Sequence, residues 1–334
     1  MSIPQNKDRL GLSGADQDGL SLIELLIALV LGLIIVAAMA QLFVNVSRTN
    51  LEMAKTNSQI ENARFAMQFL ENSVVHGGFW AGHIPEFDDL SSLDIPADFP
   101  ASVPDPCLNY ATPWTADHIA QLIGIPVQVH TNNTTAPGTC GAILSDRIAH
   151  GVSPAVGNDV LVVRHAHTCA AGASNCDDDG TTSDLLYFQA PRCVDDATYS
   201  LDPNAPLLDR SCLAGSFAPK RKFVQTIYYI RDWANEDSPK DGIPTLMRSE
   251  FGVTGTTPAQ QAAVALVEGI ERFHVELGVD NISETGVVLD PNAFQVGINW
   301  EDEDNWITAE NRGDGIPDAL EGDGTVDTDM DGVP

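Results

Sequence analysis

Hydrophobic residues are concentrated near the N-terminus of the chain. Residues 25–40 contain no charged or polar side chain, and the wider apolar stretch 20–44 is interrupted only by Ser21, Glu24 and Gln41. About 20 apolar residues are enough to cross the hydrocarbon core of a bilayer as a helix. The pattern therefore predicts a transmembrane helix over residues 20–44, in preference to the shorter apolar region of a cleaved secretory signal.

Beyond this run, hydrophobic residues continue at helical spacing. Steps of three and four residues place one set on a single helix face, and its members are Ile60, Ala63, Met67, Leu70 and Val74. The sequence HGG at residues 76–78 ends the pattern. We expect one helix over residues 20–76, about 85 Å long at 1.5 Å per residue, whose second half is amphipathic.

The following part of the chain, residues 77–300, predicts a globular head built on short strands. β-Branched and aromatic runs mark the candidate strands, which are residues 159–164, 184–189, 222–231, 245–248 and 273–277. Turn signals favour antiparallel pairing, while residues 83–157 are rich in Pro and Asp and predict long loops with short strands. The expected fold class is α+β, with the long helix packed on an antiparallel β-sheet.

The charge of the chain excludes two kinds of partner. Its 17 Lys and Arg residues stand against 47 Asp and Glu, for a formal net charge of −30. Nucleic acid and anionic lipid surfaces both bind clustered basic residues, so neither is expected as a main partner. The hydrophobic fraction of 43% is nevertheless too high for a disordered acidic chain.

Six cysteines lie beyond the apolar run, and they are Cys107, Cys140, Cys169, Cys176, Cys193 and Cys212. An even number suits disulfides in an oxidising compartment such as the periplasm, and six cysteines allow fifteen pairings. We expect neighbours to pair, which gives Cys107–Cys140, Cys169–Cys176 and Cys193–Cys212. The absence of a CxxC motif argues against a zinc ribbon or a redox dithiol of that type.

Other candidate chemistry is sparse. His165 and His167 are two residues apart and close to Cys169. On a strand they would share one face and could ligate a metal, although a solvent-facing or core role is the more common explanation. The motifs G-x-S-x-G, Walker A, H-E-x-x-H and G-x-G-x-x-G do not occur, so the chain is not expected to be an enzyme.

The start of the apolar run has a specific motif. The sequence GLSLIEL at residues 19–25 resembles the processing site of type IV prepilins. This resemblance implies that residues 1–19 are a leader peptide, that prepilin peptidase cuts after Gly19, and that the new N-terminus at Leu20 is methylated. Glu24 is then the fifth residue of the mature chain. A carboxylate within a membrane span is usually paired, and Glu24 could pair with the N-terminal ammonium of a neighbouring subunit or snorkel towards the headgroups.

Two further segments sharpen the resemblance. The sequences ARFAMQFL at residues 63–70 and GGFWAG at residues 77–82 are similar to the helix end of PilW-type minor pilins. The region 263–280 resembles a strand region of the same family. The resemblance implies a type IV pilin-like fold and a single-pass protein of the inner membrane. Its head would be periplasmic, and the protein would later reach the pilus or the cell surface.

The function implied by this resemblance is that of a minor pilin. It would join a minor-pilin complex that primes type IV pilus assembly, at the pilus tip, with roles in adhesion and twitching motility. Its partners would be other minor pilins, the major pilin, prepilin peptidase and a PilY-type adhesin. Two alternatives remain open: a GspJ-type minor pseudopilin of type II secretion, and a membrane-anchored calcium-dependent adhesin outside a filament.

The C-terminal segment 301–334 is strongly acidic, with twelve Asp and Glu residues and one Arg. Alternating carboxylates followed by Gly are typical of the start of a calcium-binding loop, and the tetrapeptide Asp-Gly-(Ile/Val)-Pro occurs at residues 314–317 and 331–334. These repeats resemble thrombospondin type 3 repeats, which implies calcium ligands at Asp314, Asp318, Asp327, Asp329 and Asp331. The alternative is a solvated acidic tail without a metal.

Overall fold

The structure is a computed structural model. It describes residues 21–85, 100, 102–110, 114–130, 136–145, 158–178, 185–191, 193, 197–203, 207–235, 240–254 and 257–278. The chain divides into two compact units, Met1–Ile60 and Glu61–Pro334. Its elements in order are α1 (Leu22–Val75), α2 (Ala116–Gly124), β1 (Val127–His130), β2 (Val160–Ala166), β3 (Tyr187–Gln189), β4 (Ser200–Asp202), β5 (Arg221–Arg231), β6 (Thr245–Thr254), β7 (Thr257–Gln260) and β8 (Val264–Glu268).

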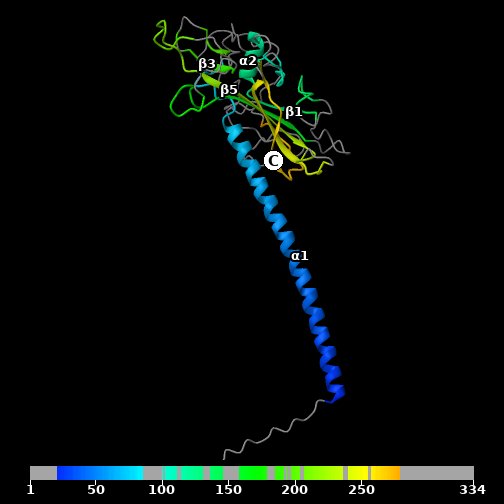
Figure 1. Ribbon diagram of the computed structural model, residues 1–334. Helices are drawn as coiled ribbons and strands as arrows, with labels where there is room; N and C mark the ends of the chain where they lie inside the picture. Colours follow the sequence, from blue (N-terminus) through cyan, green and yellow to red (C-terminus); the bar gives the residue numbers. More distant parts are fainter. Residues whose placement is uncertain are drawn as a thin grey trace, which may run out of the picture. The chain divides into compact units, whose positions relative to one another are not determined.

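Helix α1 is one continuous helix of 54 residues, the blue to cyan ribbon of Figure 1. At 1.5 Å per residue it is about 81 Å long. The expected helix over residues 20–76 therefore agrees with the structure to within two residues at the N-terminus and one at the C-terminus. Because the unit boundary falls at Ile60, the last turns of α1 belong to the unit that contains the β-sheet.

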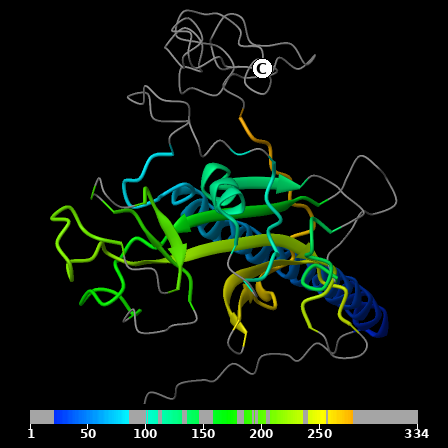
Figure 2. The same ribbon diagram turned by 90° about the horizontal axis from the view of Figure 1, so that it is seen from above.

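The eight strands form one antiparallel sheet with β5 at its centre. Strand β5 pairs with β2 on one side and β6 on the other, and its first residues also pair with β3. Strand β1 extends the sheet beyond β2, β4 pairs with β3, and both β7 and β8 pair with β6. Figure 2 shows β1, β2 and β5 side by side. The antiparallel α+β fold expected from the sequence is confirmed.

Alternating side chains of the central strands divide the core into two faces. On one face, Leu161, Val163, Tyr228 and Ile230 pack with Ala66 of α1. On the other face the partners are residues of the segment 102–145, and the cluster contains Val160, Val162, Ile227, Tyr229, Met247, Cys107, Cys140 and Leu144. Both faces of β2 and of most of β5 are buried, which explains the apolar runs at residues 160–163 and 227–230.

The face of α1 that contacts the sheet differs from the predicted one. Ala66 is buried, and Asn62, Leu70 and Ser73 beside it are half-buried, so these residues form the contact face. Asn62 Nδ2 donates to Glu268 O at 3.0 Å, which fastens this face to the end of β8. Ala66 is therefore the buried centre of the contact face, and the hydrophobic periodicity did not identify it. Of the predicted stripe, only Leu70 packs against the core.

The remaining members of that stripe stay exposed. We name Ile60, Ala63, Met67 and Val74 the outer stripe. Ile60 is 49% exposed, Met67 65% and Val74 43%, and Ala63 is exposed as well. The periodicity therefore identified a real apolar helix face, but one that does not contact the protein's own sheet.

Two other expectations were wrong in part. The region 83–157 contains the short helix α2, which begins after an N-cap Thr115 whose side chain accepts from His118 N. Its nine residues are too few for periodicity to identify a helix. The predicted strand 273–277 is not a strand, because side chains bind two of its backbone N–H groups and a single backbone bond, from Asp159 N to Phe273 O at 2.9 Å, stands in place of a ladder. Phe273 N donates to Asn158 Oδ1 at 2.8 Å and Val275 N to Asp159 Oδ2 at 2.9 Å.

Candidate assembly site

The first turn of α1 carries Glu24, the acidic residue expected to act in assembly. Ser21 caps this end, since its Oγ accepts a hydrogen bond from Glu24 N at 3.3 Å. Ser21 and Glu24 thus match the Ser-x-x-Glu capping pattern, and a carboxylate in the first turn also interacts favourably with the helix dipole. This capping signal gives a local reason for the start of α1, and Glu24 itself is exposed.

The apolar half of α1 is solvent-exposed in the part of the chain that the structure describes. Its large hydrophobic residues between Leu22 and Val46 are 48–77% exposed. The helix is long and apolar enough to cross a membrane. Glu24 is the one charged residue in this stretch. Gly19 and Leu20, the expected processing residues, lie outside the described residues.

The head contains a buried polar network that the sequence reasoning missed. Arg164 is completely buried, and its guanidinium donates to Gln225 Oε1 at 2.6 Å, Gln128 Oε1 at 2.7 Å and Ile125 O at 2.9 Å. Burial lowers the pKa of Arg164 to about 9, while Asp105 acts in the opposite direction, so the group remains charged at neutral pH. An Arg directly after the apolar run at residues 160–163 was the available signal.

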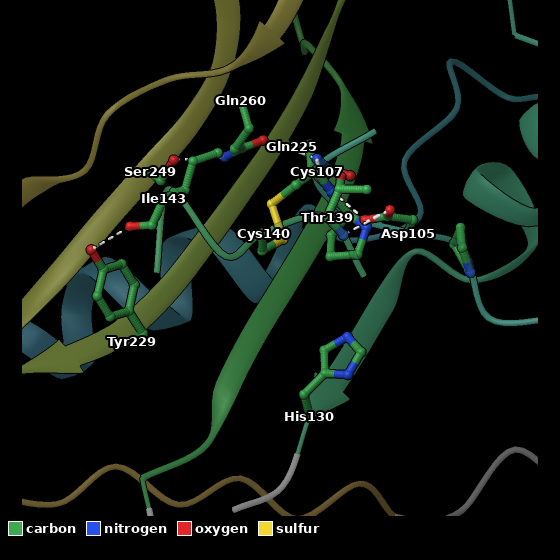
Figure 3. The surroundings of a disulfide bond; sticks show 12 residues. Asp105, Cys107, His130, Thr139, Cys140, Ile143, Gln225, Tyr229, Ser249 and Gln260 are labelled. Carbon is green, nitrogen blue, oxygen red and sulfur yellow. Dashed lines mark hydrogen bonds between the residues drawn. A yellow bond between two sulfur atoms is a disulfide. The ribbon is translucent and has the colours of Figure 1, made fainter. Parts of the chain in front are cut away.

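This network continues across the sheet to the segment around the Cys107–Cys140 disulfide. Gln225 Nε2 donates to Gln260 Oε1 at 2.9 Å and also to Pro106 O, and Gln260 Nε2 donates to Ser249 Oγ at 3.0 Å. Figure 3 shows these side chains beside the disulfide. The network contains side chains from β1, β2, β5, β6 and β7. Its bond from Gln225 to Pro106 O attaches the segment around Cys107 to the sheet.

Asp105 lies near the Cys107–Cys140 disulfide, in the segment 102–145 that packs on this face of the sheet. Its two carboxylate oxygens accept hydrogen bonds from Cys107 N at 3.0 Å and Thr139 N at 2.9 Å (Figure 3). These two bonds hold the chain on both sides of the disulfide that joins Cys107 to Cys140. Tyr229 OH of β5 also donates to Ile143 O at 3.2 Å. The disulfide and the Asp105 carboxylate therefore join the two ends of residues 105–143 to each other, while Tyr229 ties this segment to β5.

The six cysteines form three disulfides, with the neighbour pairing expected from the sequence. The Cα–Cα distances are 5.0 Å for Cys107–Cys140, 5.6 Å for Cys169–Cys176 and 5.3 Å for Cys193–Cys212. They differ in burial: Cys140 is fully buried, whereas Cys169 and Cys176 are half-buried.

The possible histidine metal site takes a different form from the predicted one. His165 is half-buried, its Nδ1 lies 2.9 Å from Ala166 O, and burial lowers its pKa. His167 instead lies next to Cys169, with Nδ1 3.1 Å from Sγ. Since both nearby cysteines are joined in a disulfide, they offer no thiolate to a metal in this state.

A third copy of the acidic tetrapeptide lies within the described head, at residues 241–244. The Asp241 carboxylate accepts hydrogen bonds from the backbone N–H groups of Ala234, Asn235 and Ile243 at 2.9–3.1 Å. Although burial acts to raise the pKa of Asp241, these bonds lower it below its ordinary value. The Asp of this copy thus closes a loop by accepting backbone hydrogen bonds. The expected calcium ligands Asp314, Asp318, Asp327, Asp329 and Asp331 lie outside the described residues.

Two protein-family models match the chain. Residues 15–40 match the prokaryotic N-terminal methylation motif, and residues 227–314 match PilW, the type IV pilus-assembly protein W. The expected family region 263–280 lies within the second match, whereas residues 63–82 lie outside both. No curated protein and no solved structure matches the chain significantly.

These matches agree with the geometry at both ends of the described chain. A methylation motif leading into a long apolar helix, together with an antiparallel-sheet head, fits a membrane-anchored pilin. The second match covers β6, β7, β8 and part of β5, and residues of β5, β6 and β8 lie in the core cluster that contains Ala66 of α1. The two matches support a type IV pilin of the PilW type, a family of structural pilus components.

Proposed function

We propose that this protein is a minor pilin that joins a minor-pilin complex and primes type IV pilus assembly at the pilus tip. The observation that carries the proposal is the uncovered apolar surface of α1 between Leu22 and Val46, with Glu24 in its first turn. Such a surface is stable in a bilayer before assembly and against other apolar helices afterwards. Burial of apolar surface contributes about 25 cal/mol per Å² where water would otherwise cover it.

Glu24 would select how the α1 helices of neighbouring subunits align along one another. In a low-dielectric environment an unpaired carboxylate is strongly unfavourable, so a helix bundle that pairs it with a cation is favoured over one that does not. After cleavage behind Gly19, the ammonium of Leu20 on a neighbouring subunit supplies that cation. The outer stripe adds apolar contact surface further along the same helix, on a face that the head leaves exposed.

The proposed course of events follows from this chemistry. The protein enters the inner membrane with its head in the periplasm, prepilin peptidase removes residues 1–19, and α1 leaves the bilayer to pack with other minor pilins and the major pilin. The head, with its three disulfides, would then present a PilY-type adhesin and support adhesion and twitching motility. The protein has a structural role in this scheme, without catalysis.

A Glu24→Ala variant tests the assembly step. Membrane insertion should be unchanged, because removal of a charge makes the helix more apolar. Incorporation into sheared pili, measured by immunoblot against the membrane fraction, should be lost. Glu52→Ala is the matched control, since Glu52 is an exposed acidic residue on the same helix beyond the apolar half. Normal piliation and normal incorporation of the Glu24→Ala protein would contradict the proposal.

The PilW match favours this function over the alternative of a GspJ-type pseudopilin of type II secretion. Deleting the gene would distinguish them, because a minor pilin affects surface piliation and a pseudopilin affects secretion of exported proteins. A calcium-dependent adhesin outside a filament would remain in the membrane fraction and be missing from sheared pili.

Calcium binding by the acidic tail is a separate proposal. The copy at residues 241–244 folds through backbone hydrogen bonds, so the tetrapeptide alone does not argue for a metal. The support is the alternation of Asp327, Asp329 and Asp331 before Gly332, which suits the oxygen ligands of calcium. Isothermal titration should detect calcium binding that is lost in the triple Asp→Asn variant. No heat of binding at millimolar calcium would refute the proposal.

A further inference from the structure

The three disulfides of the head lie in unlike surroundings. Cys140 is fully buried, Cys107 is 8% exposed and Cys193 5% exposed, whereas both sulfur-bearing residues of the Cys169–Cys176 pair are half-buried. Thiol–disulfide exchange requires access of the attacking thiolate to a sulfur atom. Cys212 is half-buried as well, so Cys169–Cys176 is the one disulfide of the three in which both cysteines are partly accessible to a reductant.

A histidine lies directly beside this disulfide. His167 Nδ1 is 3.1 Å from Cys169 Sγ, and it accepts the backbone N–H of Cys169 at 3.3 Å. A ring nitrogen that accepts a hydrogen bond carries a lone pair, which is the form that ligates metals. In the described part of the chain, the ligand atoms of His167, Cys169 and Cys176 lie within 4.8 Å of one another. The two sulfurs are bonded to each other in this state, and once reduced they could move apart to occupy two corners of a tetrahedral zinc site with the imidazole at a third.

The loop that carries these residues is also held by bonds other than the disulfide. His167 N donates to Lys222 O at 2.8 Å and Ala171 N to Lys220 O at 2.8 Å, which ties one side of the loop to the start of β5. On the other side, Tyr187 OH donates to Asp178 Oδ1 at 3.0 Å. Gly172 N donates to Asp178 O at 2.7 Å and so connects the two sides. Reduction would therefore leave the two sulfur atoms close together.

We propose that the Cys169–Cys176 loop is a redox-gated site for a borderline-soft divalent cation such as Zn²⁺. A reductant of the dithiol class supplies two electrons and two protons, the sulfur–sulfur bond breaks, and two thiols form while the reductant becomes a disulfide. A zinc ion then displaces the two thiol protons and binds the thiolates of Cys169 and Cys176 and Nδ1 of His167.

The gate follows from the ligand chemistry. In the oxidised protein neither sulfur is a thiolate, so His167 alone cannot hold the ion. In the reduced protein three protein ligands bind it and water occupies the fourth position. The ion then replaces the disulfide as the link across the loop and protects both sulfurs from reoxidation.

The test uses the full-length protein in detergent and Co²⁺ as a spectroscopic probe. A phosphine reductant is added in limited amount, and differential alkylation with mass spectrometry shows which cysteines have become free. The reduced protein should bind one equivalent of Co²⁺ with a thiolate-to-cobalt charge-transfer band, which carboxylate-bound cobalt does not give. The band should be missing from the oxidised protein.

Two variants identify the ligands. His167→Ala leaves the disulfide in place and should weaken cobalt binding by the reduced protein at least about tenfold, since losing even a hydrogen-bond partner of a metal ligand has an effect of about 10–100-fold. His165→Ala, two residues away and outside the cluster, is the matched control and should bind normally. The proposal is overturned if the reduced protein shows no charge-transfer band, or if the His167→Ala and His165→Ala proteins bind cobalt equally well.

Discussion

Replacing the buried Arg164 by Met should destabilise the head more than almost any other single exchange of similar volume. The guanidinium donates three hydrogen bonds, to Gln225 Oε1, Gln128 Oε1 and Ile125 O. Met fills much of the same space but donates nothing. Since the site is completely buried, water cannot easily replace the lost donors.

The magnitude can be worked from these contacts. Each buried acceptor left without a donor costs about 1–3 kcal/mol, and burying the Met side chain recovers about 2 kcal/mol. Three such acceptors cost about 3–9 kcal/mol, so the free energy of unfolding should fall by about 1–7 kcal/mol, a span that includes the roughly 3–5 kcal/mol found when one partner of a buried ion pair is removed. That is a large part of the total stability of about 5–15 kcal/mol of an ordinary domain.

Arg248→Met is the matched control. The Arg248 side chain is 28% exposed and forms an ion pair with Glu250 at 3.3 Å, in which the Glu250 side chain is 53% exposed. Pairs of this kind contribute at most about 1 kcal/mol. Urea unfolding of the detergent-solubilised protein, followed by fluorescence of the buried Trp80 and Trp233, measures both variants. Equal midpoints for Arg164→Met and Arg248→Met would refute the reasoning.

Two further predictions concern the disulfides and the pH dependence of stability. Double Cys→Ala exchange of Cys107 and Cys140, which are separated by 33 residues, should cost about 4 kcal/mol, against about 2.5 kcal/mol for Cys169 and Cys176 with a separation of 7; urea midpoints in the opposite order would contradict this loop-length argument. His274 lies between Glu276 Oε1 at 3.0 Å and Asp159 Oδ2 at 2.7 Å, and these hydrogen bonds raise its pKa above 6.5. Because the folded state then holds the proton more tightly than the unfolded state, this stabilisation is complete below pH 6.5 and is lost as the pH rises through the raised pKa. The melting temperature of the wild-type protein should accordingly exceed that of His274→Gln most at acidic pH, and a gap that widens at alkaline pH would be the wrong sign.

The long helix and the main strands could be predicted because their signals are local and strong. The apolar run at residues 25–40 predicts a helix, and the β-branched and aromatic residues of β5 predict a strand. Strands β2, β3 and β6 were likewise identified by residues that fill a core on both faces. The neighbour pairing expected for the cysteines also agrees with the structure, in which the paired residues are separated by 33, 7 and 19 positions.

Features that depend on distant partners could not be predicted. The contact face of α1 is set by Ala66 and by the bond from Asn62 to Glu268, which no helical periodicity reveals. The segment 273–277 has a strand-like composition, but Asn158 and Asp159 bind its backbone. Asp105 looked like one of many acidic loop residues, and only the folded chain brings it to the N–H groups of Cys107 and Thr139.

The mature N-terminus is the most direct test of the account as a whole. Glu24 can act in assembly as proposed only if the chain is cut behind Gly19, which makes Leu20 the first residue and Glu24 the fifth. Intact-mass and peptide mass spectrometry of the protein purified from its native membrane should show the loss of residues 1–19 and an N-methylated Leu20. A chain that retains its leader, or one that begins at another residue, would contradict the assignment as a pilin that assembles through this helix.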